Sequence, residues 1–339
     1  MDPVAALRRI AFLLERSQAP TYRVKAFRTA AITLAGLSPA ELEKRAKTKS
    51  LTELAGIGPK TSAVAMQALA GGVPDYLADL EATSGPLVEG GEEIRSALRG
   101  DLHSHSNWSD GGSPIEEMAV TAMELGHDYQ ALTDHSPHLT VANGLTAERL
   151  VKQLGIVATL NRHLGDFRLL SGIECDINED GTLDQTDELL GRVDIVVASV
   201  HSKLRSDSGS MTRRMLRAID NPYADILGHC TGRLVTGGRG TRPESQFDAT
   251  RVFAACAERG VAVEINSRPE RLDPPRRLLR QAVEAGCLFS IDTDAHAPGQ
   301  LDWQAYGCAR AAECGVPVDR IVNSWPLDAL LAWTTRERA

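Results

Sequence analysis

Residues 100–111 have the sequence GDLHSHSNWSDG, a short apolar segment that ends in two histidines separated by one residue. Side chains alternate along an extended strand, so His103 and His105 point to the same side and can bind one ion together. Asp110 follows in the expected loop. A single His-x-His pair also occurs by chance, so its meaning depends on what lies at the ends of the other strands.

Six more apolar segments follow, and amphipathic helical segments lie between most of them. The strand candidates are residues 129–135, 167–176, 194–201, 224–229, 261–267 and 287–296. This alternation predicts a parallel α/β barrel or a doubly wound sheet. In a parallel barrel the carboxyl ends of the strands converge on one face, where active sites form.

Histidines and carboxylates gather at these strand ends. Six of the nine histidines end or directly follow a strand candidate: His103, His105, His135, His201, His229 and His296. They are accompanied by Asp110, Asp134, Glu174, Asp292 and Asp294. We expect His127, His138 and His163, which fall outside the pattern, to be surface residues.

Imidazole and carboxylate ligands together suit zinc, manganese or iron, and no cysteine occupies these positions. The candidates are too many for one ion, so two or three divalent ions are predicted. For any one histidine the alternative is a core side chain bonded to backbone. Asp134 and Asp292 are interpreted either as outer groups that orient imidazoles or as strand-end caps.

The first 82 residues have a different character and are predicted to be all-helical. The segment LAGIGPKT, residues 54–61, is typical of a helix-hairpin-helix, in which Gly56 and Gly58 allow a tight turn. Its amides and the following helix N-terminus can hold a DNA phosphate. The predicted DNA contacts are Gly56, Gly58, Lys60, Thr61, Arg23, Lys25 and Arg28. The alternative is a solvated basic face beside an ordinary turn.

Charge divides the chain in the same way. Residues 1–70 hold 11 Lys/Arg against 5 Asp/Glu, a net of +6, whereas the whole chain of 339 residues has a net charge of −8. The remainder therefore carries −14 and would repel a polyanionic substrate unless cations occupy its carboxylate-rich site. We place a linker at residues 83–99, where Ser84-Gly85-Pro86 and Gly90-Gly91 occur.

Neither a membrane span nor a signal peptide is expected, because no apolar run approaches the roughly 20 residues that cross a bilayer. The six cysteines are dispersed without a C-x-x-C motif, which favours reduced thiols and a cytoplasmic location. No obligate protein partner is inferred.

The ordered set His103-x-His105, Asp110, Asp134-His135, Glu174, Ser199-Val200-His201, Gly228-His229 and Asp294-Ala295-His296 resembles the PHP (polymerase and histidinol phosphatase) superfamily. The segments ALTDHSPHLTVANGL, NPYADILGHCTGRL, EINSRPERLD and IVNSWPLDALLAW are similar to the PHP domain of bacterial family X DNA polymerases. The likeness covers roughly residues 98–335. It implies a distorted (βα)7 barrel over residues 100–339 with a trinuclear metal site.

The resemblance also implies which residues bind which ion. His103, His105, Glu174 and Asp294 would bind the first, Glu174, His201 and His229 the second, and Asp110, His135 and His296 the third. The implied reaction is in-line attack on a phosphoester by a metal-bridged hydroxide. His103, His105, Glu174, His201 and Asp294 would form its catalytic centre. Arg233 and Arg268 would clamp the phosphate, the alternative for each being an ion pair with a local acidic residue.

Residues 4–82 resemble the small N-terminal domain of family X polymerases, with two departures. Val64 stands where the lyase lysine is expected, so no deoxyribose-phosphate lyase activity is predicted. Only the linker separates the two parts, which leaves no room there for a polymerase palm.

The resulting hypothesis is a 3′–5′ exonuclease or 3′-end-processing repair enzyme that binds DNA ends, gaps or nicks. It would use manganese or zinc, with iron as a further option. The alternatives are a small-molecule phosphatase of the histidinol phosphatase type and a catalytically silent DNA-binding scaffold.

Overall fold

The computed structural model describes residues 1–238 and 240–335 and divides the chain into two compact units, Met1–Pro86 and Leu87–Ala339. Residues 87–99, which we expected to belong to a linker, lie in the second unit. There, helix α6 (Glu92–Ala97) contributes Ile94 to the larger hydrophobic core. Among the described residues, no helix is long and apolar enough to cross a membrane.

The first unit is all-helical, as predicted. It consists of α1 (Pro3–Arg16), α2 (Thr21–Ala35), α3 (Pro39–Thr48), a 3-10 turn (Leu51–Glu53), α4 (Pro59–Leu69) and α5 (Asp75–Thr83). Ser38 caps α3 by accepting a hydrogen bond from the Glu41 N–H, with Pro39 at the first helical position. The core is built from apolar side chains at helical spacing, including Leu7, Ile10 and Leu14 of α1.

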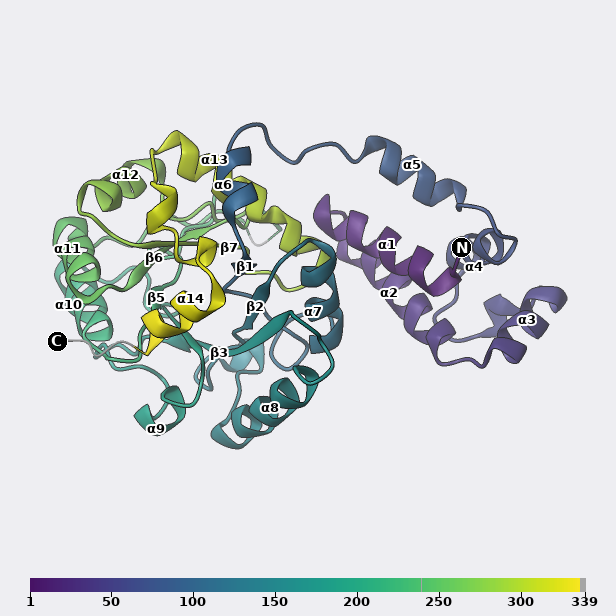
Figure 1. Cartoon of the computed structure of the whole chain (residues 1–339), viewed down its shortest axis with the longest axis horizontal. Coiled ribbons are helices and arrows are strands. Elements are labelled where there is room, and N and C mark those ends of the chain that lie inside the picture. The colour runs from purple at the N-terminus through teal and green to yellow at the C-terminus, as the bar shows by residue number, and fades with distance from the viewer. Residues whose placement is uncertain (239, 336–339) are drawn as a thin grey trace. The chain divides into compact units, whose positions relative to one another are not determined.

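The second unit is a seven-stranded parallel barrel (Figure 1). Its strands are β1 (Gly100–Asp101), β2 (Tyr129–Leu132), β3 (Arg168–Asp176), β4 (Ile195–Ser199), β5 (Ile226–Leu227), β6 (Ala262–Asn266) and β7 (Phe289–Asp292). Each strand pairs with the next one in sequence. A doubly wound sheet would reverse its order at a switch point, so this order distinguishes the two predicted architectures.

The barrel nearly closes where the chain leaves β1 and β7. Ser104 forms a parallel bridge with Ala295, whose carbonyl oxygen accepts a 2.8 Å hydrogen bond from the His105 N–H. Asp292 adds a side-chain contact by accepting a hydrogen bond from the Leu102 N–H at 2.8 Å. These contacts place the segments after the first and last strands side by side.

Helices surround the strands (Figure 1). They are α7 (Ile115–Glu124), α8 (Ala147–Leu160), α9 (Asp187–Leu190), α10 (Ser208–Ile219), α11 (Ala249–Arg259), α12 (Arg276–Glu284), α13 (Gln304–Glu313) and α14 (Leu327–Thr334). Side-chain caps fix several starts: Asp207 accepts from the Ser210 N–H at α10, and Asp248 from the Arg251 N–H at α11. Met211 and Phe253 are among the side chains these helices bury against the strands.

Strand periodicity divides each strand between two environments. On β3, Ile173 and Cys175 face the core that contains the helical side chains, whereas Leu170 belongs to the apolar cluster that includes Trp333 of α14. Glu174 lies on the same strand face as Leu170, four residues nearer the carboxyl end. The barrel interior therefore changes from apolar to polar toward the carboxyl ends of the strands.

Candidate metal centre

The carboxyl ends of the strands bring all nine predicted ligands together. His103, His105 and Asp110 follow β1, His135 follows β2, Glu174 lies in β3, His201 follows β4, His229 follows β5, and Asp294 and His296 follow β7. All are buried or nearly so except Asp110, whose side chain is 36 % exposed. Residues dispersed over almost two hundred positions thus form one cluster.

Glu174 is the centre of this cluster, contacted by histidines from four strand ends. The shortest contacts to its two carboxylate oxygens are 3.3 Å from His103 Nε2, 2.9 Å from His135 Nδ1, 3.1 Å from His201 Nε2 and 2.8 Å from His229 Nε2. Its side chain is 1 % exposed. This central position is compatible with the prediction that two ions share Glu174.

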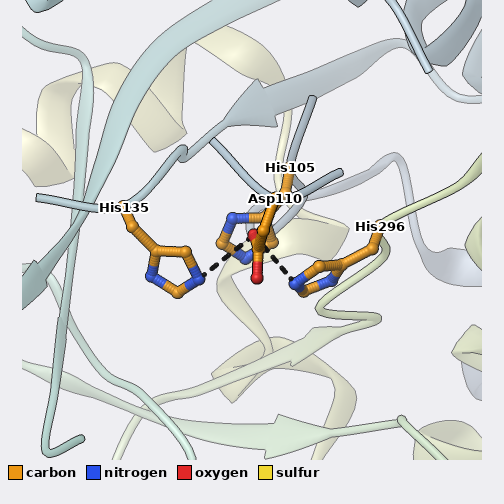
Figure 2. A group of neighbouring side chains, drawn as sticks. All are labelled: His105, Asp110, His135 and His296. Atoms are coloured by element: carbon orange, nitrogen blue, oxygen red, sulfur yellow. Dashed lines mark ion pairs between the residues drawn. The ribbon is translucent and has the colours of Figure 1, made fainter. Parts of the chain in front are cut away.

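A second group lies nearer the mouth of the barrel and is shown in Figure 2. It contains His105, Asp110, His135 and His296, with ligand atoms within 4.8 Å of one another. Asp110 Oδ1 is 3.5 Å from His135 Nε2 and 3.3 Å from His296 Nε2. This group includes the three residues expected to share one ion.

Two further groups satisfy the same distance criterion. One combines His103, His105 and Asp294, and the other His135, Glu174 and His201. His105 and His135 each belong to two groups, so the geometry allows adjacent ions to share neighbours. The assignment of each ligand to a particular ion remains a prediction.

The nitrogen atoms of the cluster fit bound cations. Both ring nitrogens of His105 and of His201, and His103 Nε2, are buried and make no hydrogen bond among the described residues. A buried polar atom without a hydrogen bond costs about 1–3 kcal/mol. Several such nitrogen atoms beside carboxylates would lower the stability of the fold, unless bound cations accept the nitrogen lone pairs.

Electrostatics within the cluster favour ionised carboxylates beside a neutral imidazole. Burial raises the pKa of Glu174, but the surrounding His103 and His201 charges lower it more, and it lies well below the usual range. Burial lowers the pKa of His105 to about 3, helped by the nearby His296 and His135 charges. Divalent ions bind deprotonated ligands, so Glu174 and His105 are already in the required state. His103 and His201, whose pKa values are raised by neighbouring carboxylates in spite of burial, would lose a proton when an ion binds.

Asp294 is held by two arginines in an unusual backbone conformation. Its φ of +53° lies in the left-handed region, which side-chain-bearing residues seldom adopt. Its Oδ2 accepts a 3.1 Å hydrogen bond from Nε of the buried Arg271, and its Oδ1 lies 3.5 Å from Arg268. Burial raises the pKa of Asp294, but Arg268 and His105 lower it well below the ordinary value.

Glu264 of β6 is a site residue that the sequence reasoning missed. Its Oε1 lies 2.5 Å from His103 Nδ1, and its Oε2 accepts a 2.5 Å hydrogen bond from the His229 N–H. A carboxylate on one ring nitrogen fixes the tautomer and leaves the other nitrogen as the ligand atom. The sequence did contain a signal for this role: Glu264 is a charged residue between the apolar Val263 and Ile265 in the middle of an expected strand.

Asp134 and Asp292 act on backbone and loops, which supports the strand-end interpretation. Asp134 accepts hydrogen bonds from the Ser106 N–H at 2.8 Å and from the Ser109 hydroxyl at 2.5 Å. These bonds fix the loop that carries Asp110. Asp292 bonds the backbone after β1, as described above.

The two predicted phosphate-clamping arginines differ in their surroundings. Arg268 lies in the site, with one terminal nitrogen 3.1 Å from His296 Nδ1. Arg233 instead donates hydrogen bonds to the carbonyl oxygens of Arg271 and Leu272 and lies 3.5 Å from Glu244. The Arg233 guanidinium thus stabilises the loop that contains Arg271 and Leu272. The alternative role, an ion pair with a local acidic residue, agrees with these contacts better than a phosphate clamp does.

His127 does not match the predicted surface position. It is 5 % exposed, and burial lowers its pKa to about 4, with Arg95 also disfavouring the charged form. His138 and His163 are exposed, as expected.

The helix-hairpin-helix turn is present, and some of the residues predicted to contact DNA there stabilise the turn itself. Gly56 has φ of +83°, and an added Cβ would lie 2.5 Å from Thr29 Cγ2, so glycine is required. The Thr61 hydroxyl accepts a hydrogen bond from the Gly58 N–H at 3.0 Å and caps α4. Thr61 is 3 % exposed, so its side chain serves the fold.

The predicted basic contacts divide in a similar way. Arg28 makes two hydrogen bonds, at 2.9 and 2.7 Å, to the buried Glu15 carboxylate, so its charge is used inside the domain. Arg23 donates to the Tyr76 hydroxyl at 2.5 Å, and Lys60 Nζ lies 3.5 Å from the centre of the Tyr76 ring. Lys25 is exposed. The positive charge is therefore not paired with a carboxylate in the contacts described for Arg23, Lys25 and Lys60.

Comparison with known families defines the class. Residues 101–268 match the PHP domain family, and residues 1–74 match a helix-hairpin-helix domain family. The second unit therefore contains a PHP domain, and the first unit contains a helix-hairpin-helix domain.

Individual relatives add detail. The chain is 39 % identical over 239 residues to the DNA polymerase/3′-5′ exonuclease PolX of Bacillus subtilis, covering 70 % of this chain and 41 % of that protein. It is 27 % identical over 235 residues to a "probable phosphatase" of Thermoanaerobacter sp., covering 66 % of this chain and 89 % of that one. A structure of histidinol phosphate phosphatase from Lactococcus lactis with zinc, L-histidinol and phosphate has a TM-score of 0.45 at 17 % identity, covering 64 % of this chain and 94 % of that one.

Proposed function

We propose that this chain is a metal-dependent phosphodiesterase that shortens or cleans DNA 3′ ends. The observation that carries the proposal is the joining of two features in one chain. One is the carboxylate Glu174, contacted by histidines from four strand ends in a barrel mouth, and the other is a basic helix-hairpin-helix domain. The B. subtilis relative supports the choice of DNA, because its name includes a 3′-5′ exonuclease.

Two or three divalent cations, manganese or zinc with iron as a further option, would be held by the nine clustered ligands. When bound, they would supply a nucleophile at neutral pH and neutralise charge on the phosphoryl oxygens. The protein's own contribution is the arrangement of donors: Glu174 at the centre, and Glu264 fixing the tautomer of His103. Arg268, which lies 3.1 Å from His296 Nδ1, would orient a phosphate oxygen.

The helix-hairpin-helix domain would bind the DNA backbone. Gly56 and Gly58 shape the turn before α4, and Lys60 with Arg23 supplies positive charge beside it. Phosphate contacts of this kind are independent of base sequence and weaken with salt. DNA ends, gaps or nicks are the proposed substrates, and the domain would raise their local concentration.

The absence of two other family X activities also remains a prediction. Val64, at the position expected for the lyase lysine, is 2 % exposed in the helical core. Residues 83–99 offer no space for a polymerase palm between the two parts. All six cysteines are buried thiols, and a reducing, cytoplasmic environment is the proposed location.

A small-molecule phosphatase is the second candidate, favoured by the "probable phosphatase" relatives whose length this chain nearly spans. The basic N-terminal domain has no evident purpose in that function. A catalytically silent scaffold is third, and the complete donor set argues against it.

The deciding experiment is digestion of a 5′-labelled oligonucleotide with manganese, zinc or iron. We expect a ladder of products shortened from the 3′ end with at least one metal. A His103→Ala/His105→Ala variant, which removes ligands from the centre of the cluster, should produce none. Release of phosphate from histidinol phosphate without any DNA shortening would favour the phosphatase, and a gel shift without either reaction would favour the scaffold.

A further inference from the structure

A cavity of about 230 Å³ opens beside the metal centre, between its ligands and a glycine-containing segment. The lining includes the predicted ligands Asp110 and His296, the neighbouring Gly237 and Gly238, and the charged Arg268 and Glu270. Small-molecule pockets generally measure about 300–1,000 Å³. This cavity therefore has room for one small unit, such as a single nucleoside.

The glycine segment is anchored on both sides, so its position is defined. The Val235 N–H donates a 2.7 Å hydrogen bond to the Glu270 carbonyl oxygen, and Leu234 exchanges two backbone hydrogen bonds with Arg242. Arg242 Nε also donates to the Gly232 carbonyl oxygen at 2.6 Å. The glycine segment is thus attached to the loop after β6, and the residues on either side of it are bonded to each other.

The two neighbouring glycines have different reasons to be glycine. Gly237 has φ of +111°, and an added Cβ would lie 2.7 Å from Glu270 Cγ, so backbone and space both require it. Gly238 has no positive φ, and among the described residues nothing lies within 4 Å of a Cβ added there. The fold itself would accept a side chain at Gly238.

We infer that Gly238 keeps this cavity open for the nucleoside attached to the reacting phosphate, and so determines the size of substrate that the site accepts. This inference rests on the proposed function. The chemistry of the lining agrees with it, because the Arg268 guanidinium suits a phosphate oxygen and the Glu270 carboxylate can accept a hydrogen bond from a sugar hydroxyl. Because the exposed Gly238 lines the cavity, a large side chain there is expected to reduce the space available to the nucleoside.

The test compares two chromogenic esters: thymidine 5′-(p-nitrophenyl phosphate), which carries a nucleoside, and p-nitrophenyl phosphate, which does not. In Gly238→Leu we expect the ratio of kcat/KM for the nucleoside ester to kcat/KM for the small ester to fall at least about tenfold, a difference of about 1.4 kcal/mol. Gly238→Ala should give a smaller fall. Gly155→Leu, at an exposed glycine of α8 with nothing within 4 Å of an added Cβ, is the matched control and should leave the ratio at its original value.

Metal content and thermal unfolding of each variant show whether the site is still assembled. An unchanged ratio in a folded, metal-loaded Gly238→Leu protein overturns the inference while the proposed function stands, because the unaltered enzyme still cleaves DNA. If the unaltered enzyme cleaves neither DNA nor the nucleoside ester, the proposed function fails and the inference fails with it.

Discussion

Replacing Glu264 with glutamine should loosen the metal centre without touching any of its nine predicted ligands. In the structure one carboxylate oxygen faces His103 Nδ1 at 2.5 Å, and the other accepts the His229 N–H at 2.5 Å. A glutamine amide has one oxygen and one NH2 group. It can therefore accept from only one of these two donors and presents N–H groups to the other.

The magnitude follows from that lost acceptor. Outer carboxylates that orient a ligating histidine typically change metal affinity or activity 10–100-fold when replaced, which corresponds to about 1.4–2.8 kcal/mol. This range agrees with the roughly 1–3 kcal/mol that a buried donor loses without its acceptor. We therefore expect Glu264→Gln to bind manganese 10–100-fold more weakly.

The assay is competition for the metal by a coloured chelator, with circular dichroism to confirm that the variant is folded. The matched control is Glu179→Gln at an exposed glutamate, whose carboxylate is 3.9 Å from Lys203 Nζ, and it should bind metal as the unaltered protein does. If Glu264→Gln retains the original affinity while Glu174→Gln loses it, the carboxylate of Glu264 does not fix the His103 tautomer and the reasoning is wrong.

Three other outcomes are expected. Arg28→Ala should destabilise the first unit by about 3 kcal/mol, because the buried Glu15 carboxylate loses its guanidinium partner, whereas Arg23→Ala should chiefly weaken DNA binding; urea unfolding and a DNA titration distinguish the two. Deleting residues 1–86 should weaken DNA binding and reduce its salt dependence while a small phosphodiester is still cleaved, and equal loss of both would contradict the division of labour. The pKa of His127 is lowered to about 4 from an ordinary 6.5, so the unfolded chain takes up the proton first as pH falls, and stability is lost between these values. Urea unfolding should show that loss as about 2 kcal/mol from pH 7 to pH 5, and His127→Asn should abolish that part of the pH dependence.

The cluster could be predicted from the sequence because it depends on local patterns, whereas those patterns left a doubly wound sheet open and the barrel followed from the family resemblance. An apolar strand that ends in histidine or aspartate can be recognised without its neighbours, and parallel strands place such ends on one face whatever their order. The helical first unit was predictable for the same reason, from periodicity and from the Ser38-Pro39 start of α3. His103 and His296 could each be proposed as metal ligands from their places at strand ends, without tertiary information.

The residues that the sequence could not describe are those whose surroundings form only in the folded chain. Arg28 and Arg233 have the same local character as Arg268, and only the folded chain shows that Glu15 binds one while two backbone carbonyl groups and Glu244 bind another. His127 lies in a polar local sequence, but Arg95 and Gln304 from elsewhere in the chain contribute to its surroundings. Charge and hydropathy along the sequence do not specify such encounters.

The bridge between Ser104 and Ala295 has a consequence for how the protein comes into existence. Because His105 and His296 flank this contact, the full set of ligands cannot assemble until the two ends of the strand series have met. Contacts between residues so far apart in sequence form late and slowly in folding. A nascent or partly folded chain therefore lacks the complete centre, and the proposed nuclease activity would be restricted to molecules that have finished folding.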